Sequence, residues 1–188
     1  MQLPAKRLLL IVDMLSDYEF PDAERLFEAA EPAVRHIREA RDEADRSGVA
    51  VAYANDIHEH WHCSPEEVCA RALEGRKPDL VRPLLPRASD AFLHKGQHSA
   101  FYGTPLAHLL HEEGVDEVVL AGQVTEQCIL YTALDAHVRH YAITVLEDAV
   151  IPLDEELGRA ALRMMERNMG ARVIPTAAFS RSLPPRQA

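Results

Sequence analysis

The sequence lacks a long uncharged apolar segment. A membrane-spanning helix needs roughly 20 apolar residues, whereas the N-terminal apolar run from Leu8 to Val12 is ended by Asp13. We therefore expect neither a signal peptide nor a membrane span, and we expect a cytoplasmic protein that does not bind membranes.

Clusters of basic residues are also missing. The chain has 20 Lys and Arg residues against 30 Asp and Glu residues, which gives a formal net charge of −10. Such a charge repels phosphate backbones, and no run of Lys or Arg opposes it. The charge therefore argues against a nucleic-acid partner.

Cysteine is scarce and odd in number, with 3 residues in the chain. This number argues against a disulfide framework in a protein without a secretion signal. Cys63 and Cys69 lack the paired spacing that is typical of zinc sites. We interpret both as reduced, partly buried thiols without an assigned role, which leaves Cys128 as the cysteine of interest.

The composition is that of a folded protein. The chain has 188 residues, of which 47% are hydrophobic and 27% charged. A chain of this size can bury a core without a metal or a disulfide. We expect residues 1–188 to form a single domain, with residues 177–188 as a tail because two prolines lie near the C-terminus.

Short apolar runs rich in β-branched residues recur along the chain. Continuous runs of this kind are typical of strands that are buried on both faces of a parallel sheet. They predict strands at residues 7–12, 49–54, 91–94, 117–121, 142–146 and 171–174.

Segments with helical periodicity separate these runs. They predict helices near residues 22–47, 65–74, 104–113, 126–140 and 154–168, and a proline-broken, non-helical excursion at residues 75–89. The alternation of strands and helices predicts an α/β fold, a three-layer αβα sandwich around a mostly parallel, Rossmann-like sheet of about six strands. Ligands bind at the carboxyl ends of strands in such sheets, where Asp13, Asp56, Lys95 and Gly122 follow or end predicted strands.

Cys128 lies in the predicted first turn of a helix that follows a strand and a glycine turn. The N–H groups and partial positive charge of such a helix end favour a thiolate and can bind an oxyanion. A bland alternative exists for each candidate residue. Cys128 can be a packing residue, Asp13 a turn or cap residue, and Lys95 a solvated lysine at a strand end.

Three ordered motifs link these residues. They are Val12-Asp13-Met14 with Tyr18 or Phe20 following, His94-Lys95 with Ser99-Ala100-Phe101 following, and Gly122-Gln-Val-Thr125-Glu126-Gln-Cys128 with Thr132, Asp135 and Ala136 following. Together they resemble the isochorismatase-like cysteine hydrolases, a superfamily that includes nicotinamidases and N-carbamoylsarcosine amidases. The resemblance covers nearly the whole chain.

The resemblance implies a catalytic triad. Asp13 would take the thiol proton and pass it to the leaving group, Lys95 would stabilise developing negative charge, and Cys128 would be the nucleophile. It also implies a cis peptide bond between Gln123 and Val124, which would turn an N–H toward the oxyanion together with Cys128. The expected pocket residues are Tyr18, Phe20, Trp61, Phe101 and Tyr102.

The resemblance favours hydrolysis of a C–N bond in a small amide or carbamoyl compound through a thioester-type intermediate. The expected partners are a small-molecule substrate and, by analogy, further copies of the same chain. Two alternatives stay open. One is vinyl-ether hydrolysis of the isochorismatase type, which would use Asp13 and Lys95, and the other is a non-catalytic module that binds a small molecule or a metal.

A group of histidines follows the second predicted strand. Asp56, His58, His60 and His62 could bind a divalent metal, as in the nicotinamidase branch of the superfamily. The preferred interpretation is a solvated loop in which Asp56 fixes a turn and Trp61 walls the pocket, so no cofactor is expected. His94 and His98 are pocket-lining candidates, whereas His36, His108 and His111 are expected on helix surfaces.

Overall fold

The computed structural model describes residues 6–56 and 63–183. Six strands form one parallel sheet in the order β3-β2-β1-β4-β5-β6. This confirms the predicted α/β class and the parallel sheet. The strands are β1 (Arg7–Val12), β2 (Ala50–Asp56), β3 (Ala91–Lys95), β4 (Glu117–Gln123), β5 (Ala142–Ile151) and β6 (Arg172–Ile174).

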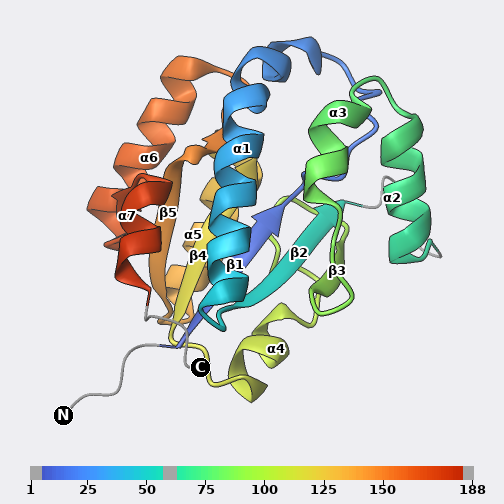
Figure 1. Ribbon diagram of the computed structural model, residues 1–188. Coiled ribbons are helices and arrows are strands. Elements are labelled where there is room, and N and C mark those ends of the chain that lie inside the picture. Colours follow the sequence, from blue (N-terminus) through green and yellow to red (C-terminus); the bar gives the residue numbers. More distant parts are fainter. Residues whose placement is uncertain (1–5, 57–62, 184–188) are drawn as a thin grey trace.

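Helices connect the strands and cover both faces of the sheet (Figure 1). None of the helices in the described ranges is long and apolar enough to span a membrane. The helices are α1 (Glu24–Arg46), α2 (Pro65–Glu74), α3 (Pro78–Val81), α4 (Leu106–Glu112), α5 (Leu130–Val138), α6 (Glu155–Met169) and α7 (Thr176–Ser182), with a 3₁₀ turn η1 (Arg82–Leu84) and a π-helical turn η2 (Thr125–Ile129).

Alternation along β1 explains the three layers. Leu9 and Ile11 belong to a buried cluster with residues of α1, α3 and α7, whereas Leu8, Leu10 and Val12 belong to a second cluster with residues of α4, α5 and α6. Successive side chains of a strand point to opposite faces, so a wholly apolar strand needs a covering layer on each side. The predicted αβα sandwich follows from this pattern.

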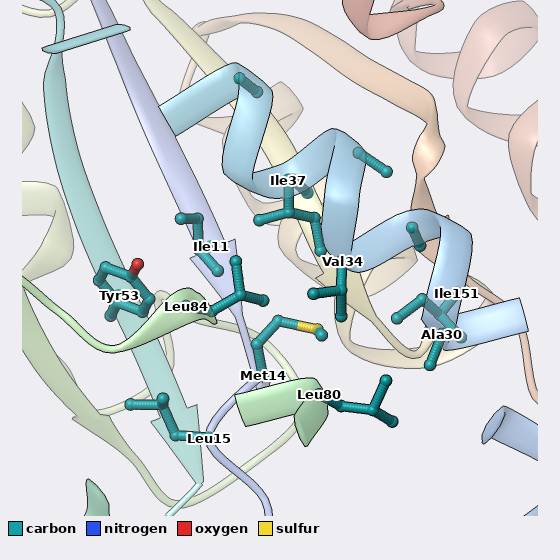
Figure 2. Close-up of a cluster of buried hydrophobic side chains, with 14 of the residues drawn as sticks. Ile11, Met14, Leu15, Ala30, Val34, Ile37, Tyr53, Leu80, Leu84 and Ile151 are labelled. Atoms are coloured by element: carbon teal, nitrogen blue, oxygen red, sulfur yellow. The ribbon is translucent and has the colours of Figure 1, made fainter. Parts of the chain in front are cut away.

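The long helix α1 covers the first of these faces. Its buried positions recur every three or four residues, as in Ala30, Val34 and Ile37, which is the spacing of one helical face. Figure 2 shows Val34 and Ile37 on the side of α1 that faces Ile11 and Leu84. Shortening Ile37 to alanine would cost about 2–5 kcal/mol of the free energy of unfolding.

The expected tail from residue 177 is wrong for the part that the structure describes. Residues 176–182 form α7, and its Phe179 is 1% exposed. The backbone N–H and the hydroxyl of Thr176 donate to Asp148 Oδ1 at 2.8 and 2.7 Å, which fixes the start of this helix. The prediction of a tail relied on the nearby prolines and did not take account of the buried side chain of Phe179.

The expectation of a non-helical excursion at residues 75–89 is also wrong in part. Pro78 occupies the first turn of α3, and Pro83 lies in the 3₁₀ turn η1. Proline is tolerated at these positions because the N–H that it lacks has no partner in the first turn of a helix. Leu80 and Leu84 from this segment are buried in the core.

The central strands β1 and β4 place the site. The chain runs from β1 to β2 and β3 on one side and returns through β4 to β6 on the other, so β1 and β4 form the switch point. Gly122 near the end of β4 has φ +118°, and a Cβ there would lie 2.1 Å from the carbonyl oxygen of Val12. Only glycine permits this approach.

Candidate active site

The three residues predicted to act together meet at the carboxyl edge of the sheet. Asp13 directly follows β1, Lys95 ends β3, and Cys128 lies in η2 after β4. Lys95 Nζ is 2.8 Å from Asp13 Oδ2 and 3.7 Å from Cys128 Sγ. The Asp13 carboxylate also interacts with the Cys128 thiol and raises its pKa. A carboxylate, an ammonium and a thiol therefore share one site.

The backbone holds the Asp13 carboxylate in a defined orientation. Asp13 has φ +54°, a left-handed conformation that Asp tolerates better than most residues. Its N–H donates to the carbonyl of Ala54 at 2.9 Å, and the N–H of Asp56 donates to its Oδ1 at 2.9 Å. Contacts from the end of β2 thus fix one carboxylate oxygen, while Lys95 pairs with the other.

Lys95 is 1% exposed. A lysine is rarely buried to this extent unless its ammonium is paired. Its ammonium donates to the carbonyl of Gln97 at 3.1 Å and lies 3.9 Å from Asp56 Oδ2. Burial lowers the pKa of Lys95, but Asp13 and the other acidic groups raise it more, so the net shift is upward. Lys95 therefore stays protonated in the site.

The charge state of the Cys128 sulfur differs from the thiolate that its place in the sequence favours. Burial and then the Asp13 carboxylate raise the pKa of the thiol to about 12, and Lys95 opposes this rise only in part. The resting site therefore holds a thiol, whose proton must leave as the sulfur attacks.

Asp13 is suited to accept that proton. Burial raises its pKa above the usual value for Asp, and the paired ammonium of Lys95 opposes the rise without cancelling it. A raised pKa makes the carboxylate a stronger base than a solvated aspartate.

The expected cis peptide bond between Gln123 and Val124 is present. The backbone of Val124 acts to lower the pKa of the Cys128 thiol, although burial and Asp13 raise it more. The Gln123 side chain donates from Nε2 to the carbonyl of Asp13 at 2.7 Å. The end of β4 therefore supports Asp13 through Gln123.

A cavity of about 200 Å³ opens at the sulfur. Of the predicted pocket residues, Phe20 lines it, and Trp61 lies outside the described residues. The described lining consists of Asp13, Ser16, Phe20, Leu26, Asn55, Asp56, His98, Gln123, Val124, Gln127 and Cys128.

The other three predicted pocket residues are not among the described residues that line this cavity, and their part in the substrate pocket stays a prediction. Tyr18 is fully buried, with its hydroxyl 3.5 Å from Gln123 Oε1, behind the wall. The ring of Phe101 stacks on Tyr141 at 6.2 Å between centroids, while Tyr102 is 65% exposed.

Sequence reasoning missed several lining residues. Asn55 fixes the loop after Asp13, because its Nδ2 donates to the carbonyl of Leu15 and its Oδ1 accepts from the N–H of the same residue, both at 2.9 Å. A buried asparagine at a strand end is a signal that could have identified it. Ser16, Leu26 and Gln127 carried no comparable signal.

Most of the candidate metal ligands lie in a segment outside the described residues. His58, His60 and His62 belong to it, and only Asp56 of the four candidate ligands is described. Within residues 6–56 and 63–183, no three His, Cys, Asp or Glu side chains gather in a geometry that could hold a metal ion. Asp56 lines the cavity beside the Lys95 ammonium, and a neighbouring cation weakens the fit of a second cation there.

Comparison with known proteins identifies the family. The profile of the isochorismatase domain matches residues 7–178. The chain belongs to the isochorismatase family. The resemblance predicted from the three motifs is thereby confirmed.

Relatives within the isochorismatase family include proteins with named activities. The chain is 34% identical over 169 residues to the uncharacterized isochorismatase family protein YaaI of Bacillus subtilis, covering 90% of this chain and 93% of that protein. It is 34% identical over 158 residues to maleamate amidohydrolase of Pseudomonas putida, covering 77% and 72%.

Solved structures of the isochorismatase family share the fold. N-carbamoylsarcosine amidase from Thermoplasma acidophilum superimposes with a TM-score of 0.71 at 29% identity, covering 91% of this chain and 96% of that chain. With the amidohydrolases among its relatives, the chain is an isochorismatase-family hydrolase.

Proposed function

We propose that this hydrolase cleaves a C–N bond in a small amide or carbamoyl compound through a thioester on Cys128. The observation that carries the proposal is the placement of the sulfur, which faces the cavity and contacts both Lys95 and Asp13. A nucleophile, a proton acceptor and a fixed positive charge are the groups that covalent acyl transfer needs.

In the first half of the reaction, Asp13 accepts the thiol proton while Sγ bonds to the substrate carbonyl carbon. The carbonyl oxygen gains negative charge, and the N–H groups of Val124 and Cys128 are the donors proposed to bind it. When the C–N bond breaks, Asp13 gives its proton to the leaving nitrogen. Lys95 keeps its proton throughout and stabilises the anionic sulfur.

In the second half, a water molecule attacks the thioester carbonyl, the C–S bond breaks, and the sulfur regains a proton. The products are a carboxylic or carbamic acid and ammonia or an amine. The cavity of about 200 Å³ supports a small-molecule substrate.

The names of two relatives support C–N hydrolysis over ether hydrolysis. Maleamate amidohydrolase and N-carbamoylsarcosine amidase are both named for bonds between carbon and nitrogen. The proposal extends this bond type, and neither relative's individual substrate, to the present chain.

A substrate screen tests the proposal. Purified protein is incubated with primary amides, N-carbamoyl compounds and isochorismate, and release of ammonia, amine or pyruvate is measured. We expect at least one C–N compound to be hydrolysed by the wild type and by Cys69→Ala, but not by Cys128→Ala. Hydrolysis of isochorismate alone, retained in Cys128→Ala, would contradict the proposal and support the ether reaction.

A further inference from the structure

A third ionisable side chain reaches the sulfur in addition to Asp13 and Lys95. His98 Nδ1 lies 3.8 Å from Cys128 Sγ, and the His98 side chain lines the cavity. Unlike the other two, His98 is exposed. The imidazole therefore touches both the reacting atom and the solvent from which a hydrolytic water comes.

The position of His98 is set by the helix that follows Cys128. Its ring packs against Tyr131 of α5 with 5.5 Å between centroids. The turn that carries it is tied to the same helix, because the N–H of Ala100 donates to Thr132 Oγ1 at 3.0 Å. Cys128 lies in η2, and contacts with the following helix α5 position His98, although 30 residues separate the two in sequence.

Asp13 is less well placed to activate water. One carboxylate oxygen pairs with Lys95 at 2.8 Å, the other accepts from the N–H of Asp56 at 2.9 Å, and the side chain is 15% exposed. Its carboxylate also interacts with the Cys128 thiol. The exposed imidazole of His98 has fewer competing contacts among the described residues, and imidazole is the side chain best matched to proton transfer near neutral pH.

We propose that His98 is a catalytic residue of the second half-reaction, the base that activates the water which hydrolyses the thioester. The water oxygen bonds to the carbonyl carbon as its proton passes to the imidazole. The C–S bond then breaks, the sulfur leaves as a thiolate beside Lys95, and the imidazolium returns the proton to Sγ across the 3.8 Å contact. This role rests on the acyl-enzyme mechanism proposed above.

The two half-reactions can be separated with 4-nitrophenyl acetate, a small activated ester that acetylates thiols. Release of 4-nitrophenolate in the first turnover reports acylation, and the steady rate reports hydrolysis of the acetyl-enzyme. We expect His98→Gln to keep the first-turnover rate within about threefold and to lose about 100-fold in the steady rate, the size of a general-base contribution. The acetyl adduct on Cys128 should accumulate and be visible by mass spectrometry.

Hydroxylamine supplies a readout that a structural role would not affect. It attacks thioesters without needing a base, so it should deacylate His98→Gln and the wild type at equal rates. His94→Gln is the matched control. The sequence made His94 a pocket candidate like His98, but His94 is not among the described residues that line the cavity, and its ring packs on Phe92 at 5.1 Å between centroids. This control should retain both wild-type rates.

Three results would overturn the role of His98. They are an unchanged steady rate in His98→Gln, an equal loss of the acylation and steady rates, or slow deacylation by hydroxylamine. Failure of the acyl-enzyme mechanism itself would look different. In that case the wild type would carry no acetyl group on Cys128, and Cys128→Ala would hydrolyse the ester as fast as the wild type.

Discussion

Two largely buried carboxylates at the ends of the central strands have pKa shifts of opposite direction. Asp13 follows the carboxyl end of β1, whereas Glu117 begins β4, so the two lie at opposite ends of the parallel strands. Burial raises the pKa of Asp13, and Lys95 does not cancel the rise. Burial also acts on Glu117, but Thr144, Arg172 and Arg7 outweigh it, so the pKa of Glu117 is lowered.

The number and kind of hydrogen-bond donors explain the difference. Glu117 accepts from Thr144 Oγ1 and Arg172 at 2.5 Å each and from Arg7 at 2.8 Å. These donors fix Glu117 as an anion, which suits a structural role. Asp13 shares its one cation with a thiol, which leaves it able to gain and lose a proton. Burial of a carboxylate alone therefore does not identify a catalytic group.

Removal of the thiol should have the largest effect on turnover. Cys128→Ala should lose activity by about 10⁴-fold or more, because Asp13 and Lys95 then have no nucleophile to serve. The fold should remain, since the substitution removes one atom at a helix start, and circular dichroism and the unfolding midpoint check this. Cys63→Ala should retain activity, and an inactive Cys63→Ala with an active Cys128→Ala would reverse the assignment.

The two carboxylates can be compared directly by matched substitutions. Asp13→Asn should lower turnover by about 10²–10⁴-fold because the amide cannot transfer the proton, while iodoacetamide should still alkylate Cys128 at the wild-type rate or faster. Glu117→Gln should lower the free energy of unfolding by about 2 kcal/mol and leave turnover of the folded protein unchanged. A loss of turnover in Glu117→Gln with none in Asp13→Asn would contradict the assignment of Asp13 as the carboxylate that transfers the proton.

Sequence patterns were sufficient for much of this architecture. The run 7–12 predicted β1 with its observed bounds, because a strand buried on both faces must be wholly apolar. The positions of Asp13 and Lys95 at strand ends then predicted their meeting, since the carboxyl ends of parallel strands share one edge. The motif around Cys128 added the third residue.

The wrong and missing parts depend on contacts between distant residues. Whether Phe101 faces the cavity depends on the turn after Lys95, which is tied to Thr132 through the N–H of Ala100. Periodicity carries no information about that bond. The contact of His98 with the sulfur depends on the same turn, which is why the sequence identified His98 only as a candidate for the pocket wall.

Loss of the shared ammonium should raise the pKa of Cys128 further. Lys95→Met removes the cation that opposes burial and Asp13, and it preserves most of the side-chain volume. Alkylation of Cys128 by iodoacetamide at fixed pH should slow about tenfold for each unit by which the pKa rises. Lys77→Met is the control, because Lys77 lies over the Phe27 ring and should leave the alkylation rate unchanged. An unchanged alkylation rate in Lys95→Met would show that Lys95 does not affect the pKa of the Cys128 thiol.

The lowered pKa of Glu117 predicts a specific dependence of stability on pH. A carboxyl group with a lower pKa in the folded state stabilises the protein above its unfolded pKa, near 4.5. That stabilisation is lost as pH falls from about 5 through the folded pKa, by roughly 1 kcal/mol for each unit of the shift. Urea unfolding over this range should show a shallower fall in Glu117→Gln than in the wild type. Parallel curves of stability against pH for the two proteins would show that titration of Glu117 does not contribute to the loss of stability in acid.

Metal removal should have the smallest effect. Asp13, Lys95 and Cys128 already supply the proton acceptor, the positive charge and the nucleophile, which leaves a metal only an orienting task. We expect dialysis against a chelator to leave turnover within about twofold of the untreated rate. Near-stoichiometric metal in untagged protein, lost together with activity in His58→Ala, would contradict this expectation.

The most direct test of the account is to trap the acyl-enzyme on the natural bond type. Wild-type protein is quenched with acid during turnover of an amide found by the screen, and its peptides are analysed by mass spectrometry. We expect an acyl group on the peptide that contains Cys128 and none on the peptides with Cys63 or Cys69. Sustained turnover in Cys128→Ala, or an acyl group only on another cysteine, would contradict it.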